Sequence, residues 1–246
     1  MRNLIVPIFL GLMCISFTII PAESTKSRTA DVVTVSPNVF TDSSLTAIDA
    51  GISLYKSSNL EQYNLSEEAF TNAWKGYQYL LNKKMISRIS YLTICDFSQS
   101  SRQKRLYILD IDNKKLIIHT YVAHGKNSGT DYATSFSNTV ESLQSSLGFY
   151  ITSNTYIGKH GLSLRINGVD PGFNDKALER TIVIHGASYV NEARARSGMY
   201  MGRSWGCPAV PENESAKIIT TIKNGTCLFI YHPSRNYLLS SKILND

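Results

Sequence analysis

The chain has 246 residues, of which 43% are hydrophobic and 18% are charged. These proportions are typical of a globular protein and exclude a disordered or fibrous chain. The formal net charge is +6, but the basic residues are dispersed, without the Lys/Arg blocks that follow nucleic-acid phosphates. We therefore expect one sizeable folded domain with an appendage and no nucleic-acid partner.

The N-terminus has the organisation of an export signal. Arg2 supplies a positive charge, residues 4–20 are largely apolar, and Pro21-Ala22 offers a small-residue cleavage site. The apolar run is marginally long enough to span a bilayer, so a membrane anchor is the alternative. The cleavage site favours a signal peptide over residues 1–22. We expect export to the periplasm or cell envelope, or secretion, with no stable membrane span after cleavage.

Helices are predicted next. Residues 23–42 are polar and read as a linker. From Ser44 apolar side chains recur every three or four residues, which indicates a helix. Ser66 is a plausible N-cap for a second helix with an aromatic stripe. Residues 43–87 are therefore predicted to form a small helical region packed on the domain that follows.

From residue 88 the hydrophobic period shortens to that of strands, and helices become few. This pattern predicts an α+β, β-rich domain over residues 88–234, followed by a C-terminal tail over 235–246. A polar stretch without periodicity, residues 135–146, is predicted to be a functional or disordered loop. The expected strands are 89–97, 105–111, 115–123, 148–152, 181–184 and 227–231. Residues 156–167 are expected to form a hairpin with its turn at 159–161, and the expected helices are 174–180 and 212–224.

The cysteines differ in their surroundings. Cys14 leaves with the signal peptide, so the mature chain keeps three thiols. Cys95 and Cys227 lie in apolar runs and are expected to be buried and inert, with a disulfide between them left open. Cys207 lies in a polar loop beside a glycine, where thiols react. The chain has neither CxxC nor HExxH, so we expect no metal site and no cofactor.

A histidine and this cysteine form the strongest candidate site. The strand at 181–184 ends in His185, and a later polar loop presents Cys207 behind Gly206. A thiol nucleophile needs a base beside it and backbone N–H groups aimed at the carbonyl that it attacks. Gly206 lets the main chain approach a substrate closely, because it has no Cβ. Cys207 and His185 are therefore the candidates for a nucleophile and its general base.

The same residues carry a resemblance to a known family. His185-Gly186, followed by Ser204-Trp205-Gly206-Cys207, resembles the L,D-transpeptidase catalytic domains of YkuD-like fold, and the form SWGCPA resembles their murein branch. The commoner pattern has histidine in place of Trp205 and arginine in place of Ala209. The resemblance covers residues 88–233 and includes the stretches 122–129, 136–138, 145–150 and 158–165.

The resemblance implies acyl transfer on peptidoglycan stem peptides. Cys207 would form a thioester, which an amine converts to a cross-link and water hydrolyses. The N–H groups of Gly206 and Cys207 are the expected oxyanion donors, and the Gly186 carbonyl is expected to orient the histidine. Two alternatives remain open: a cysteine carboxypeptidase or endopeptidase that hydrolyses wall peptides, and a wall-binding protein. The intact His185, Gly206 and Cys207 argue against the second.

Further residues are predicted to contact the substrate. Arg203 and Ser204 either brace the cysteine loop or meet a substrate carboxylate, for which arginine is the better anchor. Residues 190–201 join the histidine to the cysteine, and either overhang the site or form a surface loop. The predicted substrate-binding residues are Arg203, Ser204, Trp205, Tyr200 and His124.

Overall fold

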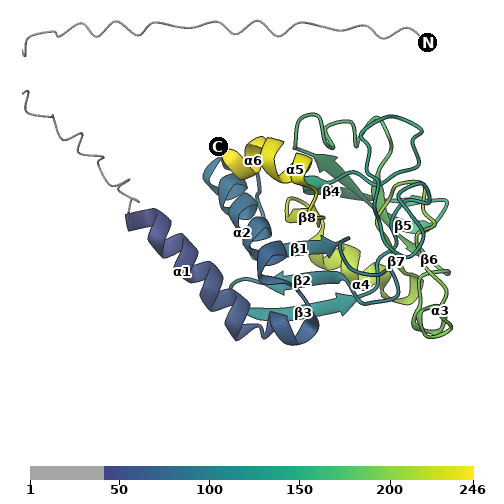
Figure 1. Ribbon diagram of the computed structural model, residues 1–246, viewed down its shortest axis with the longest axis horizontal. Coiled ribbons are helices and arrows are strands. Elements are labelled where there is room, and N and C mark those ends of the chain that lie inside the picture. The colour runs from purple at the N-terminus through teal and green to yellow at the C-terminus, as the bar shows by residue number, and fades with distance from the viewer. Residues whose placement is uncertain (1–41) are drawn as a thin grey trace, which may run out of the picture. The chain divides into compact units, whose positions relative to one another are not determined.

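The computed structural model describes residues 42–246, which lie in one compact unit (Figure 1). The predicted signal peptide, residues 1–22, and all but the last residue of the predicted linker, 23–42, lie outside the described residues. Among the described helices, none is both long and apolar enough to cross a membrane.

The N-terminal helices form as their sequence predicts. They are α1 (Asp42–Ser57), the short 3-10 helix η1 (Leu60–Tyr63) and α2 (Glu67–Asn82). The predicted cap of α2 is confirmed, because the Ser66 side chain accepts a hydrogen bond from the Ala69 N–H at 3.1 Å. The aromatic stripe of α2 is buried, and the helix packs on the sheet at β1 and β8.

One eight-stranded sheet makes up the rest, in the order β3-β2-β1-β8-β4-β5-β6-β7. The pairs β1–β8 and β6–β7 are parallel, and the other neighbours are antiparallel. The sheet is nearly closed, because an isolated bridge pairs Ala123, just after β3, with Ala209 of β7. The strands are β1 (Tyr91–Asp96), β2 (Leu106–Asp110), β3 (Lys115–Thr120), β4 (Gly148–Gly158), β5 (Gly161–Gly168), β6 (Val183–Ala187), β7 (Ala209–Pro211) and β8 (Cys227–Tyr231).

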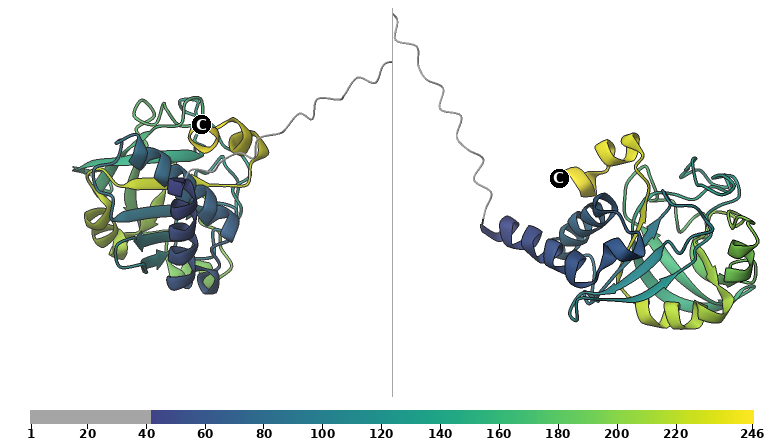
Figure 2. Two further views of the ribbon diagram at one scale, coloured as in Figure 1. Left: turned by 90° about the vertical axis from the view of Figure 1, so that its left-hand side faces the viewer. Right: turned by 60° about the horizontal axis from the view of Figure 1, so that its bottom comes forward.

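Helix α4 (Glu212–Ile222) covers the sheet at its β5–β7 end. It packs on β5, β6 and β7, and buries Ile218, Ile219 and Ile222. The short helix α3 (Glu192–Arg196) lies far from α1 and α2 in Figure 1 and in the right-hand view of Figure 2. The β6–β7 edge is therefore remote from the helical N-terminal region.

Two sequence predictions about elements are wrong, and one strand was missed. β4 is one strand through residues 148–158, with irregular pairing between Thr152 and Thr155. Strand β7 has only three residues and was not predicted. Residues 174–180 form successive turns, not a helix. Tertiary contacts hold these turns, because the Asn174 amide donates to the Phe149 carbonyl and accepts from the Asp170 N–H, each at 2.9 Å.

The C-terminal residues, expected as a tail, form α5 (Arg235–Ser240) and α6 (Lys242–Asn245). These helices lie beside α2, with Tyr237 and Leu244 buried (Figure 1). The buried Asp170 carboxylate anchors them, since it accepts hydrogen bonds from the Tyr237 hydroxyl at 2.9 Å and the Ser241 hydroxyl at 2.6 Å.

Candidate active site

His185 lies on β6, and Cys207 lies in the loop two residues before β7, the strand that pairs with β6 in parallel. His185 of β6 is in register with Ala209 of β7, so Cys207, two residues earlier, lies level with Val183. The Val183 N–H points at the Cys207 sulfur, with a nitrogen–sulfur distance of 3.5 Å. Because strand side chains alternate between faces, Val183 and His185 share a face of β6. The fold thus places His185 two residues along β6 from Val183, the residue whose N–H meets the thiol.

One hydrogen bond fixes the tautomer of His185. Its Nδ1 lies 2.8 Å from the Gly186 carbonyl oxygen, which can only accept, so Nδ1 carries the proton. In the neutral ring Nε2 then keeps its lone pair. Burial lowers the pKa of His185 below its ordinary value of 6.5; the hydrogen bond to Gly186 opposes this effect, and the neighbouring His160 adds to it. Near neutral pH the ring is therefore an uncharged base with a free nitrogen.

His160 is the site neighbour that sequence reasoning missed. Its ring stacks on the His185 ring, with the centroids 4.4 Å apart and the planes at 22°. It lies in the turn between β4 and β5, and β5 pairs with β6 through Ser163 opposite His185. The sequence marked residues 159–161 as a turn, but nothing in it showed that the hairpin places this ring on His185.

The loop before Cys207 depends on glycine and serine. Gly206 has φ +117°, a conformation that side chains disfavour, and a Cβ there would lie 2.7 Å from the Gln144 carbonyl oxygen. The buried Ser204 hydroxyl accepts from the Gly206 N–H at 3.2 Å and donates to the Cys207 carbonyl at 2.6 Å. The Gly206 N–H is thus engaged within the loop. Among the hydrogen bonds of the described residues, none uses the Cys207 N–H.

The three described cysteines are free thiols with different surroundings. Cys95 and Cys227 are buried, and burial raises the pKa of both, that of Cys95 to about 12. Cys207 is partly exposed. Burial raises its pKa as well, while the Val183 N–H and the Arg180 guanidinium lower it. Cys207 is therefore the thiol with both solvent access and groups that favour its anion.

The exposed residues among the predicted substrate contacts lie on the loop before Cys207 and on the segment that precedes this loop. Trp205 is 73% exposed, with the Lys126 ammonium 5.9 Å from its ring centroid. Arg203 is also exposed, and Tyr200 is 37% exposed. These side chains are open to a ligand, whereas Ser204 is enclosed and braces the loop.

His124 is buried and presents no ring atom to the surface. Its Nδ1 accepts from Arg105 Nη2 at 2.7 Å, and its Nε2–H donates to the Gly129 carbonyl at 3.1 Å. Burial and then the Arg105 charge lower its pKa to about 4. Its own carbonyl accepts from the Ser204 N–H at 3.1 Å. His124 supports the cysteine loop from within, in place of the predicted substrate contact.

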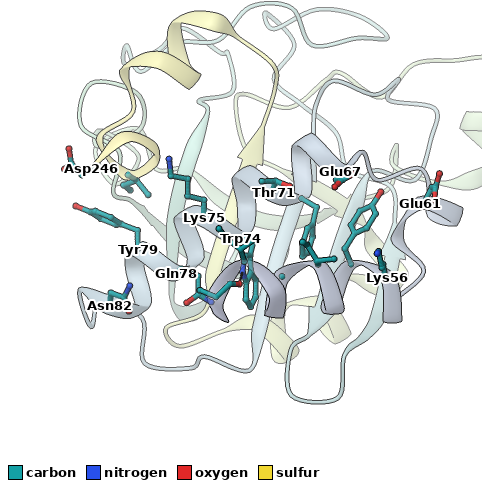
Figure 3. Close-up of a pocket in the computed structure, with 17 residues that line it drawn as sticks. Lys56, Glu61, Glu67, Thr71, Trp74, Lys75, Gln78, Tyr79, Asn82 and Asp246 are labelled. Atoms are coloured by element: carbon teal, nitrogen blue, oxygen red, sulfur yellow. Dashed lines mark hydrogen bonds between the residues drawn. The ribbon is translucent and has the colours of Figure 1, made fainter. Parts of the chain in front are cut away.

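A hollow lies away from these residues. It has a volume of about 850 Å³ and lies between α1, α2 and the C-terminus (Figure 3). Its lining includes Trp74, Lys75, Tyr79 and Asp246, and none of the candidate site residues. It therefore cannot hold a substrate against Cys207. Within residues 42–246, no cluster of three His, Cys, Asp or Glu side chains could bind a metal ion.

A nearly closed sheet that carries a neutral imidazole on β6, and brings a partly exposed thiol to the Val183 N–H of the same strand, has the parts of a cysteine-nucleophile site. The chain matches the L,D-transpeptidase catalytic domain family over residues 61–231, more than half of its length, and belongs to that family. The β-rich sheet with a small helical N-terminal region is the YkuD-like fold that the sequence resemblance implied.

Solved structures show remoter similarity. An L,D-transpeptidase from Mycobacterium smegmatis is 11% identical, with a TM-score of 0.37 over 58% of this chain and 59% of that one. The helical cell shape determining protein Pgp2 from Campylobacter jejuni is 14% identical, with a TM-score of 0.38 over 70% and 58% of the two chains. This chain thus spans less than two thirds of either protein. No curated protein sequence matches it.

Proposed function

We propose that this protein is an L,D-transpeptidase that forms cross-links between peptidoglycan stem peptides through a thioester on Cys207. The observation that carries the proposal is the hydrogen bond from His185 Nδ1 to the Gly186 carbonyl. It leaves Nε2 as the free base on the strand beside the thiol. Family membership supplies the substrate class.

The residues divide the first half-reaction among them. His185 Nε2 takes the thiol proton, and the Cys207 thiolate attacks the carbonyl on the L-centre of the third stem residue. The Cys207 N–H, which has no partner among the described residues, donates to the resulting oxyanion. Gly206 shapes the loop, since its own N–H is engaged by Ser204. His185 returns the proton to the leaving nitrogen, D-alanine departs, and a thioester remains.

The second half-reaction transfers the acyl group to an amine of another stem. The amine attacks the thioester, His185 takes its proton, and the thiol is regenerated as the amide forms. Arg203 is the proposed anchor for a stem carboxylate, and Trp205 and Tyr200 are the proposed walls of the cleft. All three are open to a ligand.

Hydrolysis is the second candidate function, and Trp205 is the observation that favours it. This exposed indole stands where the commoner family pattern has histidine. It narrows one side of the cleft if it folds over the thiol, and a narrow cleft admits water more readily than a second stem. The enzyme would then act as an L,D-carboxypeptidase or endopeptidase.

Product masses separate the two functions. Purified tetrapeptide-stem muropeptides are incubated with the protein, with and without excess acceptor amine. Transfer yields a dimer joined between two third residues, together with free D-alanine. Tripeptide monomer alone, in the presence of acceptor, contradicts the transpeptidase proposal and assigns hydrolysis. Neither product forms with the Cys207→Ala variant, whereas turnover by that variant would contradict both functions.

The proposed place of action is the periplasm or cell envelope, because the substrate lies there and the first residues have the order of a signal peptide. N-terminal sequencing of the protein from the envelope fraction is expected to begin near Glu23. Recovery of the uncleaved chain from the cytoplasm contradicts the proposed export.

A further inference from the structure

Arg180 holds the polar loop that lies behind the nucleophile. It is half-buried and ends the turns that lead into β6. Its Nη1 donates to the Ser137 carbonyl at 2.7 Å and also to the Ser146 hydroxyl. Its Nη2 donates to the Gln144 carbonyl at 2.6 Å and to the Ser142 hydroxyl at 3.2 Å. One guanidinium thus ties four residues of the loop together.

The charge of Arg180 has no acidic partner. All four of its acceptors are neutral, being two main-chain carbonyls and two serine hydroxyls. The ion pairs of the described residues are Arg102–Asp131 and Arg196–Glu192, and Arg180 belongs to neither. A half-buried cation is costly without a counter-charge. Some anion formed during function would therefore find a favourable place beside it.

The Cys207 thiolate is the anion that the proposed reaction would form close to this guanidinium. Arg180 Nη2 lies 3.2 Å from the point where a Cβ on Gly206 would stand, so the guanidinium lies against the main chain just before the cysteine. The loop that Arg180 holds also contacts this main chain, because the Ser145 hydroxyl donates to the Gly206 carbonyl at 3.1 Å. The positive charge of Arg180 lowers the pKa of Cys207 against the effect of burial.

Other titratable groups around the thiol do not supply this charge. His185 on β6 is neutral because burial and His160 lower its pKa. Tyr189, which follows β6, has its pKa raised to about 12 by burial first and then by Cys207. Tyr150 of β4 faces Arg180 and also has a raised pKa, chiefly through burial. Both phenols are uncharged near pH 7, which leaves Arg180 as the buried cation.

We propose that Arg180 is a positioning residue of the active site, whose charge favours the Cys207 thiolate and whose hydrogen bonds fix the 137–146 loop that packs against Gly206. This inference rests on Cys207 as the nucleophile of the proposed function. It adds a fixed cation to the His185 base, so that the thiol loses its proton more readily than burial alone allows.

The charge and the hydrogen bonds can be separated by substitution. Arg180→Gln removes the charge, and Arg180→Lys keeps it while losing the planar set of donors. Ser146→Ala removes one hydrogen bond and no charge. Arg88→Gln is the matched control, because Arg88, which lies just before β1, also donates to a main-chain carbonyl. Its acceptor is the Lys223 carbonyl, at 2.6 Å.

The measurement is the rate of iodoacetamide alkylation at Cys207 against pH, followed by peptide mapping. Arg180→Gln is expected to raise the apparent pKa of Cys207 by about one unit, which is about tenfold less thiolate near neutral pH. Arg180→Lys, Ser146→Ala and Arg88→Gln are expected to titrate close to the wild type. An unchanged titration in Arg180→Gln overturns the proposal.

Arg180→Lys keeps the test decisive if Arg180→Gln does not fold, as judged by circular dichroism. If the pKa of Cys207 in Arg180→Lys equals that of the wild type, the result supports an effect of the positive charge. If the pKa of Cys207 rises by a full unit in this variant, the result overturns the proposal. Alkylation needs no substrate. Failure with muropeptides would therefore leave this result standing, and failure here would leave the transpeptidase proposal untouched.

Discussion

A single carbonyl, that of Gly186, decides what His185 can do. By accepting from Nδ1 it assigns the tautomer and replaces the carboxylate that often orients a catalytic histidine. The sequence indicated the pair and this carbonyl through a short motif. It gave no sign of Arg180 or His160 as site residues, because a hydrogen-bonded guanidinium and a stacked ring depend on how distant segments pack.

His160 is expected to set the acid limit of activity. His185 must be neutral to act as a base, so activity is lost as pH falls through its pKa. Burial and the stacked His160 hold that pKa below 6.5 in the folded protein. His160→Ala removes both the covering ring and the electrostatic effect of His160 on His185, and both changes raise the pKa of His185. The acid limb of kcat/KM should therefore move to higher pH.

The adjacent Lys159→Ala serves as the control for His160→Ala, since it changes the same exposed turn without touching the imidazole stack. An acid limb that stays in place in His160→Ala, or that moves equally in Lys159→Ala, shows that the stacked ring does not tune His185.

The thiols are expected to react in a fixed order. Cys207 is partly exposed, whereas Cys95 and Cys227 are buried with raised pKa values. Mild alkylation of the native protein followed by peptide mapping should label Cys207 at least about tenfold faster than either other cysteine. After unfolding all three should react alike. Faster labelling of Cys95 or Cys227 in the native protein would remove the basis for choosing Cys207.

At the scale of elements, the sequence predicted those helices and strands that depend on interactions between neighbouring residues. The cap at Ser66 and the strand Cys227–Tyr231 were located correctly, because a capping hydroxyl and an apolar run act over a few residues. β7 is too short to show a period, and it is held by pairing with β6. Residues 174–180 have helical composition, but the Asn174 side chain binds the main chain of Asp170 and Phe149 and favours turns.

Asp170 should be a stability determinant of the C-terminal helices. Its buried carboxylate accepts from the Phe149 N–H at 2.9 Å and from the hydroxyls of Tyr237 and Ser241. Asp170→Ala leaves these donors without a partner, so the free energy of unfolding should fall by about 3 kcal/mol or more. Urea denaturation measures the change. The exposed Asp112→Ala is the control, and an equal loss in both variants would show that Asp170 anchors nothing.

At the scale of the whole molecule, the near closure of the sheet brings the site together. The bridges Ala123–Ala209 and Gly125–Ser204 join the chain after β3 to the cysteine loop, which is the far end of the strand order. Composition and periodicity predicted a β-rich domain with N-terminal helices. They could not predict this closure or the packing of the C-terminal helices on α2, because both depend on contacts between residues distant in sequence.

The thioester itself is the most direct test of the whole account. The protein is mixed with a tetrapeptide-stem muropeptide without acceptor, quenched in acid, and its intact mass is measured, followed by peptide mapping. We predict a mass increase equal to the acylated stem without D-alanine, located on Cys207 and absent in Cys207→Ala. An adduct on any other residue, or turnover of the stem with no adduct and undiminished in Cys207→Ala, would contradict the account.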